Sequence, residues 1–429
     1  MTSLAMPRPY AVAAGVIIAL AVAAGAAAQP DELVVTTSQA DLRLSAENGF
    51  DIVEIAGDKC SLEGAPGAPW LPVRNVHILI PSERAVAAVS AEVLEEVPLK
   101  GAHMLHPAQP PVPTNGLRDA AFVPPDPAAY AATGPLHPEA AVLVDTALVR
   151  GYRMAIVRVY PVDYVPARQQ VLLRTAIRLR LEFGAQAAPA TPAAYAVPSP
   201  TFERLVREDV INPEAADKPE YAPMRPLSMT ESGEVQYLLI GDASMFGAFQ
   251  PLLDWKTKKG VPAEAVDVQW ICANYPGADT QERIKACIKE YVERKGTLWV
   301  ALAGDDAIVP DRDCYVNMGS DSDTAIPTDL YYAGLDDMNW DDDGDGLAAE
   351  TTDTIDMGPD VFVGRLPIRT VADAEAVANK TLAYEKHIPA GGFAEEMLLT
   401  GVKLWSAGDS EGKSESMFTS YIHPYWSGA

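Results

Sequence analysis

The chain has 429 residues, and its 59 Asp and Glu against 33 Lys and Arg give a formal net charge of −26. Domains usually hold about 100 to 200 residues, so this length predicts two of them. The negative charge repels phosphate backbones and anionic membrane surfaces. It therefore argues against a nucleic-acid partner and favours cationic ligands or metal ions, with a merely solvated acidic surface as the alternative.

The first 28 residues have the layout of a secretory signal peptide. Arg8 precedes an apolar run from Ala11 to Ala24, and small residues lead up to a predicted cleavage after Ala28. The run is shorter than the roughly 20 residues that a membrane-spanning helix needs, and no later segment is long and apolar enough. We therefore expect a mature chain without a transmembrane segment, secreted or held at the cell surface.

Residues 29–183 predict a β-rich domain. Short apolar runs at 33–35, 53–55 and 76–80 are typical of strands. Between Met154 and Phe183 apolar residues alternate with arginines, which predicts an antiparallel hairpin with one face buried.

Residues 184–232 differ in composition from both flanks, because Ala, Pro, Gln and Thr dominate their first part and prolines recur throughout. This composition predicts a linker that proteases can reach.

From residue 233 to 429 the pattern predicts alternating strands and helices. Strands are expected at 236–240, 261–268, 298–303, 361–363 and 397–402, and helices at 244–259, 280–295, 371–387 and from about 410. Such alternation predicts an α/β domain whose mostly parallel sheet is covered by helices on both faces.

The four cysteines are too far apart for a disulfide-dense scaffold or a structural zinc site. They are Cys60, Cys272, Cys287 and Cys314. One disulfide among the last three is left open, since exported proteins can form them. Cys287 falls on the apolar face of a predicted helix, whereas Cys272 and Cys314 are predicted in loops without a histidine nearby in sequence. A spatial pair of Cys314 with His387 is an open alternative.

An acidic run around residue 343 has the spacing of a calcium-binding loop. Carboxylates recur at alternate positions and Gly346 follows, as the sharp turn of such a loop requires. Thr352 stands where a helix-loop-helix site has its bidentate glutamate, so neighbouring acids are expected to replace it. The predicted Ca²⁺ ligands are Asp341, Asp343, Asp345, Glu350 and Asp353. A solvated acidic turn is the alternative, although carboxylates packed without a cation repel each other.

Four motifs in the second half occur in a fixed order. They are Gly304-Asp305 with Pro310, the run 327–332 (PTDLYY), the run 360–367 (DVFVGRLP), and Asn379-Lys380 with Tyr384-Glu385. With these motifs the chain from about residue 235 onward resembles the gingipain-like cysteine peptidases, peptidase family C25. The resemblance implies a caspase-like layered α/β domain, incomplete at its C-terminus, and a secreted endopeptidase that acts on proteins or peptides.

The N-terminal half resembles the pro-domain of the same family through residues 67–81 and 160–183. The resemblance implies that this β-rich domain assists the folding of the catalytic domain and inhibits it. It also implies release by cleavage in or near residues 184–232.

The family uses a cysteine nucleophile and a histidine base in a His-Gly motif, and neither motif is present here. The resemblance thus implies no catalytic residue in this chain, which is expected to be an inactive fragment. It also places Glu415 near the acidic residue of the substrate pocket, with an exposed helical glutamate as the alternative. A competing hypothesis is a non-catalytic secreted module for calcium binding or adhesion. A longer reading frame with a His-Gly and a downstream Cys would separate the two.

Overall fold

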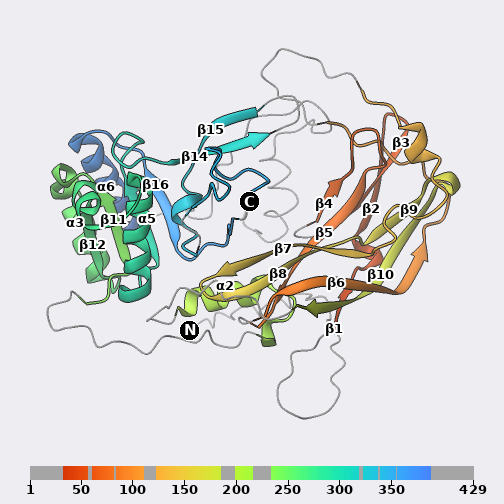
Figure 1. The fold of residues 1–429 in the computed structure, drawn as a ribbon, viewed down its shortest axis with the longest axis horizontal. Helices are drawn as coiled ribbons and strands as arrows, with labels where there is room; N and C mark the ends of the chain where they lie inside the picture. The colour runs from red at the N-terminus through yellow and green to blue at the C-terminus, as the bar shows by residue number, and fades with distance from the viewer. Residues whose placement is uncertain are drawn as a thin grey trace, which may run out of the picture.

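A computed structural model describes the protein over nine stretches of chain. They are residues 32–56, 60–81, 84–110, 122–184, 199–215, 233–317, 322–336, 339–353 and 355–387. These residues form a β-rich half and an α/β half (Figure 1). The predicted signal peptide, with Ala28, lies outside the described residues, and so do the predicted strand at 397–402 and Glu415.

The β-rich half consists of two antiparallel sheets and a hairpin. One sheet has the order β1-β10-β6, with β9 pairing β10, and the other has the order β4-β5-β8-β7. The strands are β1 (Glu32–Thr36), β4 (Cys60–Glu63), β5 (Leu71–Leu79), β6 (Val86–Pro98), β7 (Ala141–Val149), β8 (Tyr152–Val159), β9 (Val162–Val165) and β10 (Gln170–Phe183), with the hairpin β2 (Leu42–Glu47) and β3 (Phe50–Ile55). Buried residues of both sheets share one core, in which Val76 and Val157 pack with Ile177 and Leu179.

An antiparallel hairpin is present in the range predicted between Met154 and Phe183, formed by β9 and β10, but β8 does not join it. β8 pairs with β5 and β7, whereas β10 belongs to the other sheet and pairs with β1, β6 and β9. Alternation of apolar residues identifies the face that a strand buries, but both sheets bury a face in the same core. The pattern therefore could not distinguish between them.

Residues 199–215 fall inside the range predicted as linker, but they are folded against the β-rich half. They form α2 (Pro200–Asp209) and the short helix η3 (Pro213–Ala215). The Asn212 side chain exchanges hydrogen bonds with the backbone of Leu79, and the Ile211 amide donates to the carbonyl of His77. This segment therefore extends the β-rich half.

The α/β half is built on the parallel sheet β12-β11-β13-β16. Its strands are β11 (Tyr237–Gly241), β12 (Ala263–Asp267), β13 (Trp299–Ala303) and β16 (Phe362–Leu366). Leu239 faces α3 (Phe246–Lys258) and α6 (Val371–Lys386), and its neighbours Leu238 and Ile240 face the opposite core with α4 (Val268–Asn274) and α5 (Thr280–Glu290). The predicted parallel sheet with helices on both faces is confirmed.

Helix ends in this half follow local signals. Asp279 caps the first turn of α5, and Gly296 ends the turn after it with φ of +76°. Thr370 and Asp373 form a capping box at the start of α6.

Several elements were not predicted. In the β-rich half they include β2, β4, β6, β7 and the short helix α1 (Pro127–Tyr130). In the α/β half they include the helix α4 and the hairpin of β14 (Arg312–Asn317) and β15 (Ser322–Thr328). The hairpin lies on the side of the α/β half that faces the β-rich half (Figure 1). Among the helices of the described ranges, none has both the length and the apolar composition needed to cross a membrane.

Candidate functional site

Three of the four sequence motifs meet at one side chain, that of Arg365 in β16. Its guanidinium donates two hydrogen bonds to the Asp329 carboxylate, at 2.8 and 2.6 Å. It also donates to the carbonyl oxygens of Gly304, at 2.9 Å, and Val309, at 2.6 Å. The bonds to Asp329 are the main reason that the pKa of Arg365 lies above its usual value. The strand was predicted at 361–363, but β16 extends further and includes Arg365, opposite Leu302.

The same motifs are tied together at two further points. The Tyr332 hydroxyl donates to the carbonyl of Pro310. Asp360 is fully buried, accepts a hydrogen bond from the Leu335 amide at 2.8 Å, and donates its own amide to the carbonyl of Ala333. These motif residues therefore hold the loops of the α/β half together. Their spacing in sequence gave no signal for this network, because its partners lie up to 61 positions apart.

The carboxyl edge of the parallel sheet, where α/β proteins keep their sites, carries acidic residues that already have partners. Asp242 accepts a hydrogen bond from the Ser244 amide, and Asp267 accepts from the amides of Ala243 and Trp270. Asp305 forms an ion pair with Arg369. Caps and ion pairs therefore order this edge.

The thiols of Cys287 and Cys314 in the α/β half lie in environments that disfavour a nucleophile. Cys287 in α5 is buried, as predicted, and burial raises the pKa of its thiol to about 12. Burial likewise raises the pKa of the Cys314 thiol. A thiolate is the reactive form, so both shifts work against catalysis. The loop predictions were wrong: Cys314 lies in β14, and Cys272 lies in α4 with its sulfur 3.8 Å from the Thr280 hydroxyl.

The described histidines lie mostly in the other half. Those of the β-rich half are His77, His103, His106 and His137. His387 is exposed at the end of α6, which covers the sheet face opposite to the core that holds Cys314. The structure therefore does not support the pair of Cys314 with His387. All four cysteines are described, and none forms a disulfide.

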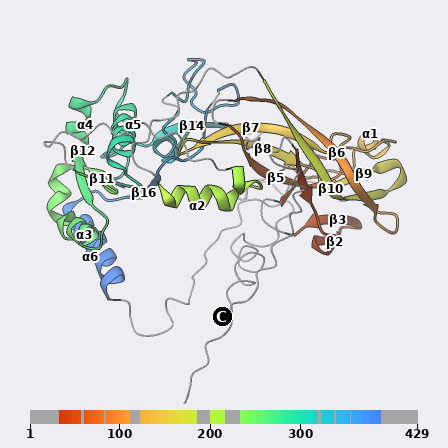
Figure 2. The same ribbon diagram turned by 90° about the horizontal axis from the view of Figure 1, so that it is seen from below.

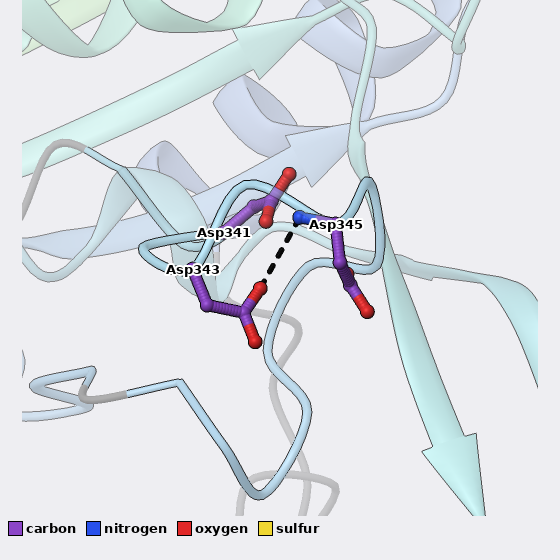
Figure 3. Close-up of side chains that lie close together, drawn as sticks. All are labelled: Asp341, Asp343 and Asp345. Atoms are coloured by element: carbon purple, nitrogen blue, oxygen red, sulfur yellow. Dashed lines mark hydrogen bonds between the residues drawn. The ribbon is translucent and has the colours of Figure 1, made fainter.

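The acidic loop brings three of its predicted ligands together. One carboxylate oxygen of each of Asp341, Asp343 and Asp345 lies within 4.8 Å of the others (Figure 3). The Asp345 amide donates to Asp343 at 3.2 Å, and the Gly346 amide donates to Asp341 at 3.0 Å. Gly344 and Gly346 have φ of +76° and +92°, which glycine adopts without strain.

The other two predicted ligands are placed differently. The Asp353 carboxylate accepts hydrogen bonds from the amides of Asp342 and Glu350, both at 3.0 Å, and so joins the two ends of the loop. The Thr352 hydroxyl contacts both Glu350 and Asp343. Thr352 therefore links Glu350 to Asp343, one of the three clustered aspartates. The assignments of Glu415 and of the cleavage after Ala28 stay predictions.

Two family profiles match the chain, one after the other. The profile described as peptidase family C25 matches residues 230–426, and the profile of the C25 propeptide matches residues 47–219. The first match covers the α/β half, and the second covers most of the β-rich half together with α2.

The chain is also similar to individual proteins of Porphyromonas gingivalis. Lys-gingipain W83 is 23% identical over 350 residues, which cover 78% of this chain and 18% of the relative, and Lys-gingipain HG66 matches equally well. The chain thus spans less than a fifth of the curated relatives that it matches. Among solved structures, the gingipain K zymogen is 20% identical, covering 36% of this chain and 87% of that chain with a TM-score of 0.30. The complex of RgpB pro- and mature domains is 15% identical, covering 42% and 91% with a TM-score of 0.32.

Proposed function

Since this chain belongs to peptidase family C25 and carries that family's propeptide before the peptidase region, we propose that it functions in an exported cysteine endopeptidase that cleaves proteins or peptides. The order of the two matches, residues 47–219 and then 230–426, carries the proposal. In this proposal the β-rich half with α2 is the propeptide, which assists the folding of the peptidase and inhibits it, and the α/β half belongs to a caspase-like catalytic domain.

The chemistry of such an enzyme needs a thiolate beside an imidazole, with backbone amides stabilising the oxyanion. The high thiol pKa of Cys287 and Cys314 argues against either of them as the nucleophile. The described residues contribute the scaffold: the Arg365 network fixes the loops of the sheet.

The test is an activity measurement on the enzyme as its organism exports it. Cleavage of a denatured protein should be abolished by a thiol alkylator, and the exported chain should begin at Gln29 before activation. Replacing Cys272 or Cys314 with Ala should leave kcat/KM within about threefold, because neither thiol takes part in the reaction. A loss of activity with an unchanged melting temperature would place the nucleophile in this half after all.

The competing hypothesis of a non-catalytic module is not favoured by the comparisons, since both profiles belong to a peptidase family. Calcium binding is compatible with either function, and we propose a structural Ca²⁺ site in the acidic loop. Besides the three clustered carboxylates, one oxygen of Asp341 is buried and has no hydrogen-bond partner among the described residues. A calcium ion prefers such oxygen ligands and would remove the repulsion among them.

Millimolar Ca²⁺ is expected to raise the melting temperature of the α/β half by a few degrees, because an ion that binds only the folded state stabilises it. The double substitution Asp343→Ala and Asp345→Ala should abolish this rise. Asp342→Asn is the matched control, since Asp342 lies in the same loop but outside the cluster. No effect of Ca²⁺ on the unmodified protein would contradict the site.

A further inference from the structure

A cavity of about 780 Å³ lies where the two halves meet. Residues of β5, β7, β8 and α2 form its wall on one side, and residues 353, 355–359 and 362 of the α/β half form the other. Figure 2 shows α2 between β16 and the strands of the β-rich half. Pockets for small organic ligands commonly enclose about 300 to 1,000 Å³, so this cavity has the size of a ligand site.

Direct contacts fix the two walls of the cavity relative to each other. Arg150, in the turn between β7 and β8, is buried and donates hydrogen bonds to the carbonyl oxygens of Thr297, at 3.1 Å, and Asp360, at 2.8 Å. The Phe202 ring of α2 stacks on that of Phe362 in β16, with centroids 4.8 Å apart. The cavity is therefore already formed in the folded chain.

Most residues that line the cavity are apolar, and several of them are accessible to solvent. The side chains of Val144 in β7, Leu205 in α2 and Met357 in the α/β half are 47%, 36% and 52% exposed. Apolar side chains that gather on an exposed surface mark a place where something binds, whereas scattered ones do not. The apolar body of a ligand would cover this surface from both walls.

Two carboxylates of the lining have no basic partner among the described residues. Asp145 accepts a hydrogen bond from the Thr146 amide at 2.7 Å, and Asp356 accepts from the amides of Leu148 and Gly358, both at 2.8 Å. Burial, and then the charges of neighbouring carboxylates that include Asp145, raise the pKa of Asp356 to about 6. A cation beside both groups would offset the cost of burial and their mutual repulsion.

The charge of the whole lining has the same sign. Four aspartates line the cavity, namely Asp145, Asp209, Asp353 and Asp356, and the one basic side chain among the described lining residues is His77. His77 is paired with Asp209. The lining therefore carries an excess of negative charge beside an apolar surface, and this combination is complementary to a ligand that is both apolar and cationic.

We propose that this cavity binds a small organic cation, whose apolar body packs against Leu205 and Met357 and whose ammonium group lies beside Asp145 and Asp356. The site is separate from the edge where an α/β enzyme has its chemistry. The cavity reaches β16 at Phe362, the first residue of that strand, whereas the carboxyl edge lies at the opposite end. The proposal therefore does not depend on the peptidase function.

The test titrates the full chain with dansylcadaverine, a fluorescent primary amine whose emission rises and shifts to shorter wavelength when its ring system enters an apolar cavity. The titration is done at pH 7, where Asp356 is mostly ionised. Saturable binding is expected. Dansyl pentylamide, which has the same body but no amine, should bind at least about tenfold more weakly, because it cannot neutralise the two carboxylates.

Two variants separate the charged part of the site from the apolar part. The double substitution Asp145→Asn and Asp356→Asn should weaken binding of dansylcadaverine at least about tenfold and leave binding of dansyl pentylamide within about twofold. Leu205→Ala should weaken binding of both probes about threefold, because each loses the same apolar contact.

Asp254→Asn is the matched control, since Asp254 is an exposed aspartate of α3 outside the lining, and its affinities should equal those of the unmodified chain. Melting temperatures show that each variant is folded. Absence of saturable binding to the unmodified chain would mean that the chain itself or a second copy fills the cavity, and it would overturn the proposal. An affinity for dansylcadaverine that is unchanged in the folded double variant would overturn it as well, because the amine would then bind elsewhere.

Discussion

Replacing Arg365 with Ala is expected to lower the free energy of unfolding of the α/β half by about 3 kcal/mol, at the low end for breaking a largely buried ion pair. The substitution removes four hydrogen bonds at once and leaves the Asp329 carboxylate and two carbonyls without their donor. The side chains of Arg365 and Asp329 are 18% and 28% exposed, so water can compensate only in part.

The measurement is denaturant unfolding of the full chain, followed by far-UV circular dichroism of the helices, most of which belong to the α/β half. Arg365→Lys should recover only part of the loss, because an ammonium group cannot make the two parallel bonds to Asp329. Arg369→Ala is the control: its side chain is 80% exposed in its pair with Asp305, so a cost below about 1 kcal/mol is expected. Equal losses for Arg365→Ala and Arg369→Ala would show that the network is not what holds these loops.

The free energy of unfolding of the full chain is expected to fall by about 1 kcal/mol between pH 5 and pH 7 because of Asp356. Burial is the main cause that raises the pKa of Asp356 from 3.8 to about 6 in the folded chain. Unfolding exposes Asp356, so its pKa should fall back toward 3.8, and folding then favours the protonated form. This contribution is complete below pH 3.8 and is lost as the pH rises through about 6.

Other charged groups face Asp356, and the control must separate their effects. The charges of Asp336 and Asp145 raise its pKa further, in the same direction as burial. A cavity of about 780 Å³ at the junction is lined by Asp356 and also by His77, Asp145, Asp209 and Asp353. His77 is paired with Asp209 inside the β-rich half.

Asp356→Asn removes the ionisable group and keeps its size. At pH 7 the variant should be at least as stable as the unmodified chain, and its free energy of unfolding should vary less between pH 5 and pH 7. A pH slope that is unchanged in Asp356→Asn would assign the effect to the surrounding carboxylates instead.

The elements of the α/β half were largely predictable because their signals are local. The apolar run 298–303 predicted β13. The helix predicted at 280–295 ends before Gly296, whose φ of +76° is a conformation that glycine adopts without strain. The short helix α4 and the hairpin β14–β15 were missed, since brief segments carry too few residues for a period to be recognised.

The candidate site was predictable only as a set of motifs. The order of Gly304-Asp305, residues 327–332 and residues 360–367 indicated the family, and the acid spacing brought Asp341, Asp343 and Asp345 together as expected. That Arg365 joins the motifs was not visible, because Asp329 and Gly304 reach it only through the crossover connections of the sheet.

The two-part organisation, the parallel sheet with its helices and the resemblance to family C25 follow from composition, periodicity and motif order, which are set by residues close together in the sequence. The sheet that each strand of the β-rich half joins, and the contact between the two halves, depend on packing between distant residues and are seen only in the folded chain. In the sequence Arg150-Gly151 is an ordinary turn, but in the folded chain the Arg150 guanidinium donates hydrogen bonds to two carbonyl oxygens of the α/β half. Its partners Thr297 and Asp360 are 147 and 210 positions away, so only the folded chain brings them into contact.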